Sequence, residues 1–347
     1  MDGIIKNDIC DFNNLHKAMR KCRKGVSWKD SVARYTNNGL ASIARLCSML
    51  EDDSYTIDDY FKFTIHEPKT RNIVSTKFKD RVFQRSMCDQ YLYEAITRGF
   101  IYDNGACQLN RGNDFSRERL KVHLRKYYNK HGSDGYVLKV DFKNYFGSTP
   151  HGTIKKVLDI VLDDEWVSDK VFDIIDSYNE GDRTGVGLGS QVSQLEQLLV
   201  LNGLDHYMKE KLHVRHYLRY MDDIVIIHND KEFLKECLIH IIEYVADIGL
   251  NLNDKKTQIF PLKHRINFLG FRFGLSVTGT VFCTIDKNNV KKYKRQLRRY
   301  RILVEEEQMS REEVDDCYVA WKAHAGKGNS FHVVQNMNRY YKELWRA

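Results

Sequence analysis

Residues 216–228 read HYLRYMDDIVIIH, so that two adjacent acids separate two apolar runs. The pattern predicts a pair of strands over 214–228, joined by a hairpin turn that holds Asp222 and Asp223. A tight turn ordinarily uses Gly or Asn to reach positive φ, and two carboxylates beside an apolar core repel each other and lose hydration. A bound divalent cation would remove both penalties. The pattern therefore favours a metal site over an ordinary turn.

Other adjacent acid pairs in the chain can be compared with Asp222 and Asp223. Four further pairs lie in polar or helical surroundings, which is typical of solvated surface: 52–53, 58–59, 163–164 and 315–316. None of these four interrupts an apolar run in the way that Asp222 and Asp223 do.

A third acid, Asp141, follows the apolar run Tyr136–Val140. Taken alone, Asp141 would be an unremarkable acid at the end of a strand. Two-metal phosphoryl or nucleotidyl transfer needs carboxylates that bridge ions about 3.5 to 4 Å apart. Two strands of one sheet, one ending in Asp141 and the other in Asp222, can meet that spacing.

The composition describes a globular chain of 347 residues with 42% hydrophobic and 29% charged residues. There is no apolar run of the roughly 18 residues that a membrane helix needs, and the N-terminus lacks the order of a secretory signal. The eight cysteines form no Cys-x-x-Cys pair, so that reduced thiols in a cytoplasmic protein are expected. A net charge of +8, with 20 Tyr and 17 Phe, is compatible with a polyanionic partner.

The pattern along the chain mixes helices and strands without a regular repeat, and no Gly/Ser/Pro-rich linker divides it. One closely packed unit is therefore expected. The elements that the periodicity predicts are helices over 1–60, 150–162 and 191–211, a hairpin over 61–74 with a basic tip at 67–71, and a strand over 136–146.

The segment Lys287–Arg301 carries eight basic residues and no acid, and its apolar residues recur every three or four positions. This predicts a helix with one packed stripe and an otherwise positive surface. Such a surface suits phosphate contacts along a duplex, and we expect them from Lys291, Arg295 and Arg298. The alternative is a solvated face. A capping box at Ser310 and Glu313 predicts a second helix that stops near Gly326, and a third follows from about 333 to 345.

Several of these residues, in this order, resemble the motifs of bacterial reverse transcriptases, including those of diversity-generating retroelements, retrons and phage-defence systems. Tyr220-Met221-Asp222-Asp223 resembles the Tyr-x-Asp-Asp box, and Asp141-Phe142-x-x-Tyr145-Phe146 the first palm motif. The other matching segments are Gly185–Gln194, Glu67–Lys69 with Asp80–Val82, Gly249–Asn253 with Lys256-Thr257, and Phe268–Gly270. Gly187 and Leu188 depart from the family's usual residues.

The resemblance implies an α+β right-hand polymerase with an antiparallel palm sheet and a helical thumb. The expected divisions are an N-terminal helical extension over 1–60, fingers over 61–135, a palm over 136–275 and a thumb over 276–347. The implied reaction is RNA-directed DNA synthesis, in which a primer 3′-hydroxyl attacks a deoxynucleoside triphosphate (dNTP).

The resemblance also assigns roles to individual residues. Asp141 and Asp222 would ligate Mg²⁺, or Mn²⁺, with the carbonyl of Phe142, and Asp223 would be the secondary acid. The residues implied to meet the nucleotide are Lys69, Arg71, Phe142, Phe146, Gly189, Gln194 and Lys256. Phe146 would exclude a 2′-hydroxyl, and its alternative is a core residue. Lys256 would steady the pyrophosphate, for which neighbouring Lys255 is the alternative.

The implied partners are an RNA template, the DNA product, dNTPs and a dedicated noncoding RNA, with an accessory protein or a second copy of the chain in addition; no membrane is implied. The role that we expect is antiviral defence in the cytoplasm. The alternatives are a diversity-generating retroelement enzyme, a template-independent or repeat-synthesising DNA polymerase on the same fold, and a non-catalytic nucleic-acid-binding protein.

Overall fold

The computed structural model describes residues 3–66, 71–179, 181–187 and 189–346, and at Arg71 and Asn72 it describes the backbone alone. The expected basic tip of the hairpin, including Lys69, lies outside the described residues, as do the side chain of Arg71 and Leu188. No helix in the described ranges is long and apolar enough to cross a membrane.

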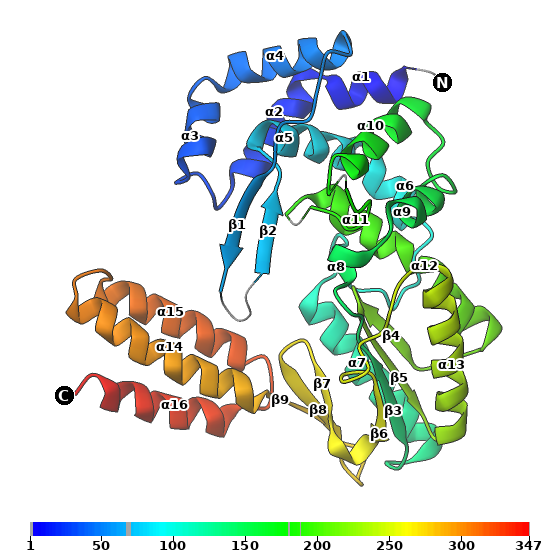
Figure 1. The fold of residues 1–347 in the computed structure, drawn as a ribbon. Helices are drawn as coiled ribbons and strands as arrows, with labels where there is room; N and C mark the ends of the chain where they lie inside the picture. The colour runs from blue at the N-terminus through cyan, green and yellow to red at the C-terminus, as the bar shows by residue number, and fades with distance from the viewer. Residues whose placement is uncertain (1–2, 67–70, 180, 188, 347) are drawn as a thin grey trace.

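The N-terminal part consists of helices packed around a shared apolar interior (Figure 1). On α2, Leu15, Ala18 and Met19 recur at helical spacing and are buried. The elements of this part are α1 (Ile4–Cys10), α2 (Phe12–Arg23), α3 (Asp30–Asn37), α4 (Gly39–Glu51), α5 (Phe78–Met87) and α6 (Tyr93–Thr97). The expected helical content before residue 60 is present, although the last helix of that region ends at Glu51.

The predicted hairpin is present as β1 (Phe61–Ile65) and β2 (Arg71–Ser75), paired antiparallel. Figure 1 shows it projecting from the N-terminal helices toward the C-terminal helices. The alternating residues Phe61, Phe63 and Ile65 share one face of β1, as the period of two requires, and all three are exposed.

The palm sheet has the strand order β4-β5-β3-β6, and every neighbouring pair is antiparallel. Its strands are β3 (Tyr136–Val140), β4 (Tyr217–Tyr220), β5 (Asp223–His228) and β6 (Gln258–Pro261). Leu138 and Ile226 face a first core, which includes the N-terminal helices, whereas Val137 and Ile227 face a second. The sheet is therefore a wall between two cores, which explains why β5 is apolar on both faces.

Helices cover both faces of the sheet (Figure 1). Helix α7 (Asn113–His131) contributes Leu120 and Leu124 to the second core. The helices that contribute to the first core are α9 (His151–Leu158), α10 (Glu165–Asp176), α11 (Gln191–Val200), α12 (Asn202–His206) and α13 (Lys231–Asp247).

Two expected elements differ from the observed ones. The strand expected over 136–146 ends at Val140, and Asn144, at φ 50°, turns the chain into the short helix α8 (Tyr145–Ser148). The helix expected over 191–211 is interrupted at Leu201, and after α12 it continues as a π-helical turn over Tyr207–Lys211. Asn and Gly are weak helix formers, and an added Cβ at Gly203 would lie 2.2 Å from the Tyr244 hydroxyl oxygen.

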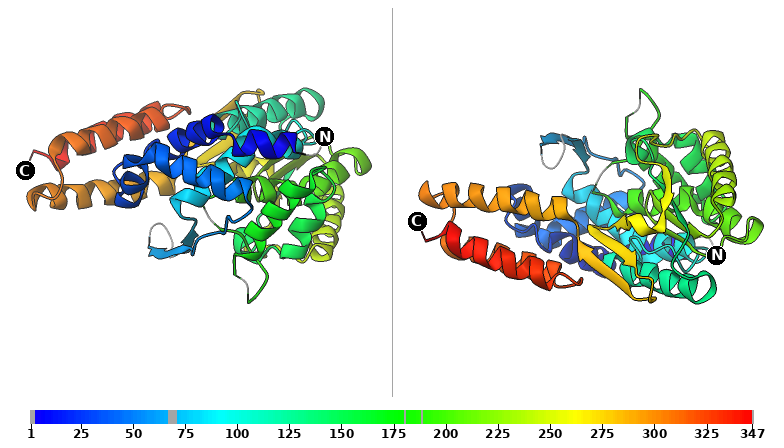
Figure 2. Two further views of the ribbon diagram at one scale, coloured as in Figure 1. Left: turned by 90° about the horizontal axis from the view of Figure 1, so that it is seen from above. Right: turned by 90° about the horizontal axis from the view of Figure 1, so that it is seen from below.

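The C-terminal part begins with the three-stranded sheet β7 (Ile266–Phe268), β8 (Phe271–Leu275) and β9 (Val281–Ile285). The helices α14 (Lys287–Glu305), α15 (Arg311–Ala325) and α16 (Phe331–Leu344) follow, and both views of Figure 2 show them projecting to one side. The predicted capping box at Ser310 and Glu313 is confirmed.

The projecting helices pack on aromatic side chains. Trp321 lies parallel to Tyr293, with ring centroids 4.9 Å apart, and Tyr318 stacks on Tyr341 at 3.9 Å. Tyr293 and Leu297, both on the predicted stripe of α14, are buried, so the stripe forms the inner face of that helix.

Candidate active site

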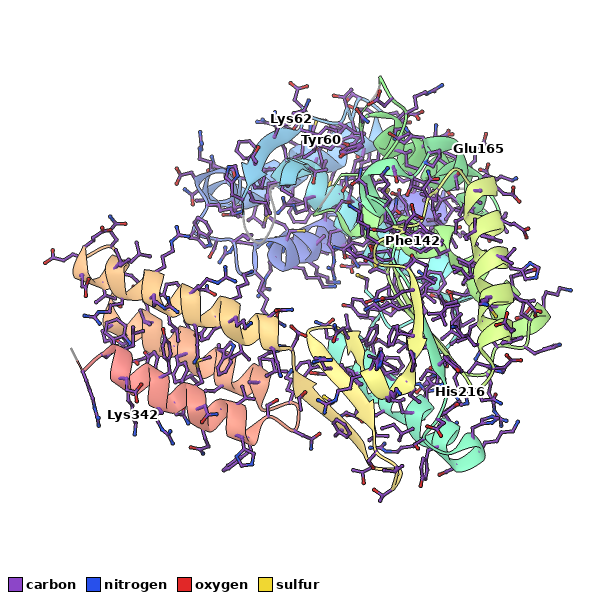
Figure 3. All side chains as sticks on the ribbon, turned by 60° about the horizontal axis from the view of Figure 1, so that its bottom comes forward. Tyr60, Lys62, Phe142, Glu165, His216 and Lys342 are labelled. Carbon is purple, nitrogen blue, oxygen red and sulfur yellow. The ribbon has the colours of Figure 1, made fainter. Side chains whose placement is uncertain are left out.

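Three carboxylates lie at one edge of the palm sheet. Val140 pairs with Ile224, so Asp141 follows the end of β3 where Asp223 begins β5. Asp222 is the second residue of the two-residue turn between β4 and β5. Figure 3 labels Phe142 at this edge and His216 at the opposite end of the sheet. The expected neighbouring strands thus bring Asp141 to the turn that contains Asp222.

The backbone of the turn is held in an uncommon conformation. Tyr220 pairs with Asp223, and Met221 between them has a φ of 54°. A side chain in this left-handed region costs about 1 to 2 kcal/mol, which is why Gly is favoured at such a position. The turn therefore has the positive φ that a tight turn requires, but the residue that adopts it is Met221 and not the usual Gly or Asn.

Burial raises the pKa of two of the acids. Burial, together with the repulsion from Asp141, raises the pKa of Asp222 above its ordinary value. Burial raises the pKa of Asp223 to about 6, although Lys139 partly opposes the rise. The Oδ1 atom of Asp223 is buried and has no hydrogen-bond partner among the described residues.

Two lysines supply the positive charge at this edge. The Lys256 Nζ donates to both oxygens of Asp141, at 2.7 and 2.9 Å. The Lys139 Nζ lies 3.2 Å from Asp223 Oδ2 and also donates to the carbonyl of Asn267. Lys255 is exposed. The geometry therefore brings Lys256, and not its neighbour, to the carboxylates.

The donor chemistry of the three acids suits a hard divalent cation, because such ions take carboxylate and carbonyl oxygens. The repulsion between Asp141 and Asp222 and the unsatisfied oxygen of Asp223 are both features that a cation would relieve. Within the described ranges, however, no three His, Cys, Asp or Glu side chains stand in a metal-binding cluster. Instead, the Lys256 ammonium forms an ion pair with the Asp141 carboxylate.

The predicted nucleotide-contacting residues lie beside this edge. The Phe142 side chain is buried, and the residue forms a bridge with Leu252. Phe146 is half-buried, lies against the Tyr145 ring, and its carbonyl accepts from the Val186 amide at 3.0 Å. Phe146 therefore packs in part as a core residue does, its side chain is partly exposed, and its backbone is hydrogen-bonded to the Gly-rich loop.

The Gly-rich loop ends at the start of α11. Gly185 and Gly189 have φ values of 82° and 97°, which favour glycine, and an added Cβ at Gly185 would lie 3.0 Å from the Gly147 carbonyl oxygen. Ser190 caps the helix, since its side chain accepts from the Ser193 amide. Gln194 lies in the first turn and is partly exposed. The loop thus approaches the segment that carries Phe146.

The positive face of α14 is present, with Lys291, Arg295 and Arg298 all exposed. A surface groove on this helix is lined in part by Lys292, Arg295 and Arg299. The Arg298 Nε donates to the Tyr340 hydroxyl at 3.0 Å, so this guanidinium also braces α14 against α16.

The sequence analysis did not identify two features of the structure. Lys139, two residues before Asp141, shares its face of β3, so alternation could have revealed it. The second feature is a buried arginine next to the turn, to which no local pattern points. The basic residues that precede Trp28 in the sequence include Arg20, Arg23 and Lys24, which line part of a hollow between α2 and the start of α4.

The four-stranded antiparallel palm, the projecting hairpin and the three C-terminal helices make this a right-hand polymerase fold. Residues 63–273 match the family described as reverse transcriptase (RNA-dependent DNA polymerase), a family of nucleotidyltransferases. Because the match covers well over half of the chain, the chain belongs to the reverse transcriptase family.

One solved telomerase structure supports the fold. The chain resembles telomerase from Candida albicans in complex with a fragment of telomeric RNA, with a TM-score of 0.51, 12% identity, and coverage of 70% of this chain and 49% of that one. Apo telomerase from Candida tropicalis, truncated from the C-terminal domain, has a TM-score of 0.48, 14% identity, and coverage of 66% and 55%. The chain spans about half the length of these telomerases. No curated protein matches it.

Proposed function

We propose that the chain is an RNA-directed DNA polymerase that extends a primer 3′-hydroxyl with dNTPs. The observation that carries the proposal is the meeting of Asp141 with the Asp222-Asp223 turn at one edge of the palm sheet, in a member of this family. Three carboxylates at one edge are unfavourable without a cation, and a non-catalytic protein would have no use for them.

Asp141, Asp222 and the Phe142 carbonyl would hold Mg²⁺ or Mn²⁺, with Asp223 as the secondary acid. Bound cations would activate the attacking oxygen and support the leaving pyrophosphate. Lys256 neutralises Asp141 in the meantime, and once displaced from that carboxylate its ammonium is free to neutralise the pyrophosphate.

We infer a deoxyribonucleotide substrate from Phe146, whose open part would lie under the sugar and exclude a 2′-hydroxyl. Gly189 and Gln194, at the start of α11, would meet the nucleotide or the template. Arg71, at the start of β2, would neutralise the triphosphate together with Lys69, which lies outside the described residues.

The positive face of α14 would carry the template–primer duplex through its phosphates, with Lys291, Arg295 and Arg298 as contacts. The hollow lined by Arg20 and Arg23 offers a second positive surface, and it supports a further RNA partner such as a dedicated noncoding RNA. With that partner, and with an accessory protein or a second copy, we propose a role in antiviral defence; the alternative is diversification of a target gene.

Primer extension by the purified protein tests the proposal. With an RNA template, Mg²⁺ and dNTPs, the product should follow the template sequence, and Asp222→Asn should abolish incorporation without loss of the fold. Asp316→Asn, on the exposed face of α15, is the matched control and should remain active. Incorporation that ignores the template would favour the template-independent alternative, and full activity of Asp222→Asn would refute the mechanism.

A further inference from the structure

Arg219 is a fully buried arginine three residues before Asp222, on the strand that leads into the turn. Its guanidinium forms a two-pronged ion pair with Asp205 of α12, at 2.6 Å from Nη2 and 2.7 Å from Nε to the carboxylate oxygens. Asp205 is equally buried and also accepts from the Tyr217 hydroxyl at 2.7 Å.

The same guanidinium holds the catalytic turn. Its Nη1 donates to the carbonyl of Met221 at 3.0 Å. Met221 is the turn residue at φ 54°, so the hydrogen bond holds the residue of the turn that has the unfavourable backbone conformation. The peptide that Arg219 holds in this way is the one that joins Met221 to Asp222.

Arg219 also joins the turn to α11. Its Nη2 donates to the Leu198 carbonyl at 2.9 Å, in the helix that begins at the Gly-rich loop. Its backbone is tied to a third segment, because its amide donates to the Asp103 carbonyl at 3.1 Å and its own carbonyl accepts from the Gly105 amide at 3.2 Å. One side chain thus connects the carboxylate turn with the helix proposed to meet the nucleotide.

Stability alone is a poor reason for this arrangement. A buried ion pair loses so much hydration that an apolar pair of similar volume is often as stable or more stable. The planar fork of an arginine, in contrast, can serve Asp205, Leu198 and Met221 at once in fixed directions. The geometry is useful if the position of Asp222 must be fixed.

On the proposed polymerase function, we infer that Arg219 is a positioning residue, which sets Asp222 for cation binding and registers the turn against α11. It contacts no substrate. Its removal should therefore lower kcat and weaken cation binding much more than it changes the KM for the nucleotide.

The test uses variants that avoid an unpaired buried charge. Tyr217→Phe is the background and the matched control, because it removes a hydrogen bond to Asp205 but leaves Met221 held. Arg219→Met with Asp205→Leu in that background removes the ion pair and the hold on the turn together. We expect this variant to fold, with kcat lowered by about 10- to 100-fold, as small misplacements of reacting groups produce. The Mg²⁺ concentration for half-maximal rate should rise several-fold, with the nucleotide KM nearly unchanged.

A second variant tests the inference if the variant with Arg219→Met and Asp205→Leu does not fold. Arg219→Lys keeps the charge but cannot reach three acceptors in fixed directions, so it should fold and show the same change in Mg²⁺ dependence to a smaller degree. A wild-type kcat and Mg²⁺ dependence in either folded variant would overturn the inference.

Cation binding can also be measured without turnover, as the rise in melting temperature when Mg²⁺ or Mn²⁺ is added. If the wild-type protein polymerises nothing, the proposed function fails, but the melting rise still tests Arg219. A rise as large in the Arg219 variants as in Tyr217→Phe would refute the positioning role.

Discussion

Replacing Glu196 with glutamine should stabilise the folded protein at neutral pH. Glu196 lies on α11, is 1% exposed, and neither of its carboxylate oxygens has a hydrogen-bond partner among the described residues. Burial raises the pKa of this carboxyl from an ordinary value of 4.5 to about 8. The folded protein therefore keeps it protonated under conditions in which the unfolded chain has released the proton.

The difference between the pKa values of Glu196 in the folded and unfolded protein sets how the free energy of unfolding changes with pH. Well below pH 4.5 both states hold the proton, and the pKa difference has no effect on stability. Above that pH the unfolded chain ionises alone, so the free energy of unfolding falls by about 1.4 kcal/mol per pH unit until the folded carboxyl titrates near pH 8. From about pH 5 to pH 7.5 the loss is about 3 kcal/mol.

Glutamine has the same shape and does not titrate, so Glu196→Gln should remove this fall. Urea unfolding of both proteins at about pH 5 and pH 7.5 should show the variant gaining about 3 kcal/mol on the wild type between the two conditions. Glu236→Gln, on the exposed side of α13, is the control and should leave the pH dependence unchanged. A constant difference between Glu196→Gln and wild type would mean that the buried carboxyl is ionised in the folded protein.

Three other variants test the proposed roles of single residues and of the thumb. Phe146→Ala should open space under the sugar, so that ribonucleotides compete with deoxynucleotides in side-by-side incorporation kinetics. Replacing Lys291, Arg295 and Arg298 together should lower the slope of log duplex affinity against log salt by about three contacts, without changing sequence preference. Lys256→Met should lower kcat, because the pyrophosphate loses its cation, while less Mg²⁺ is needed for half-maximal rate, because Asp141 loses its competing ammonium.

Each of these has a contrary result, and the two single substitutions also have a matched control. Phe146→Tyr keeps the ring and should keep the sugar preference, and an unchanged preference in the alanine variant would make Phe146 a core residue only. An unchanged salt slope would mean that the duplex does not bind along α14. Replacing Arg20, Arg23 and Lys24 should then lower the slope instead. Lys255→Met should have little effect, so equal losses at the two lysines would contradict the role given to Lys256.

Local sequence predicted much of the fold. The alternation of Phe61, Phe63 and Ile65, the stripe on α14 and the capping box at Ser310 each depend on residues within a few positions of one another, and all three are present. The weak helix formers Asn202 and Gly203 are a local signal for the interruption after α11, but only the structure shows that the Tyr244 hydroxyl lies in the space that a side chain at Gly203 would need.

The electrostatic partners could not be predicted in the same way. Lys256 and Asp141 are 115 residues apart, and they meet because β6 pairs with β3 and the segment before β6 forms a bridge with Phe142. The pairing of Arg219 with Asp205 depends on where α12 comes to lie, and no spacing along the chain encodes it. Residue chemistry indicated the carboxylates, and alternation along β3 could have revealed Lys139, whereas the pairing of Lys256 with Asp141 required the three-dimensional arrangement.

The palm sheet separates two cores, and this position affects the order in which we expect the protein to unfold. Its strands turn alternate side chains to the two cores, so one core can open while the sheet still rests on the other. The inner strands β3 and β5 have a hydrogen-bonded neighbour on each side, so their amides should exchange with deuterium only when both cores are lost. Asp141 and Asp223 follow and begin those two strands. We therefore expect the proposed chemistry to rest on the part of the molecule that opens last.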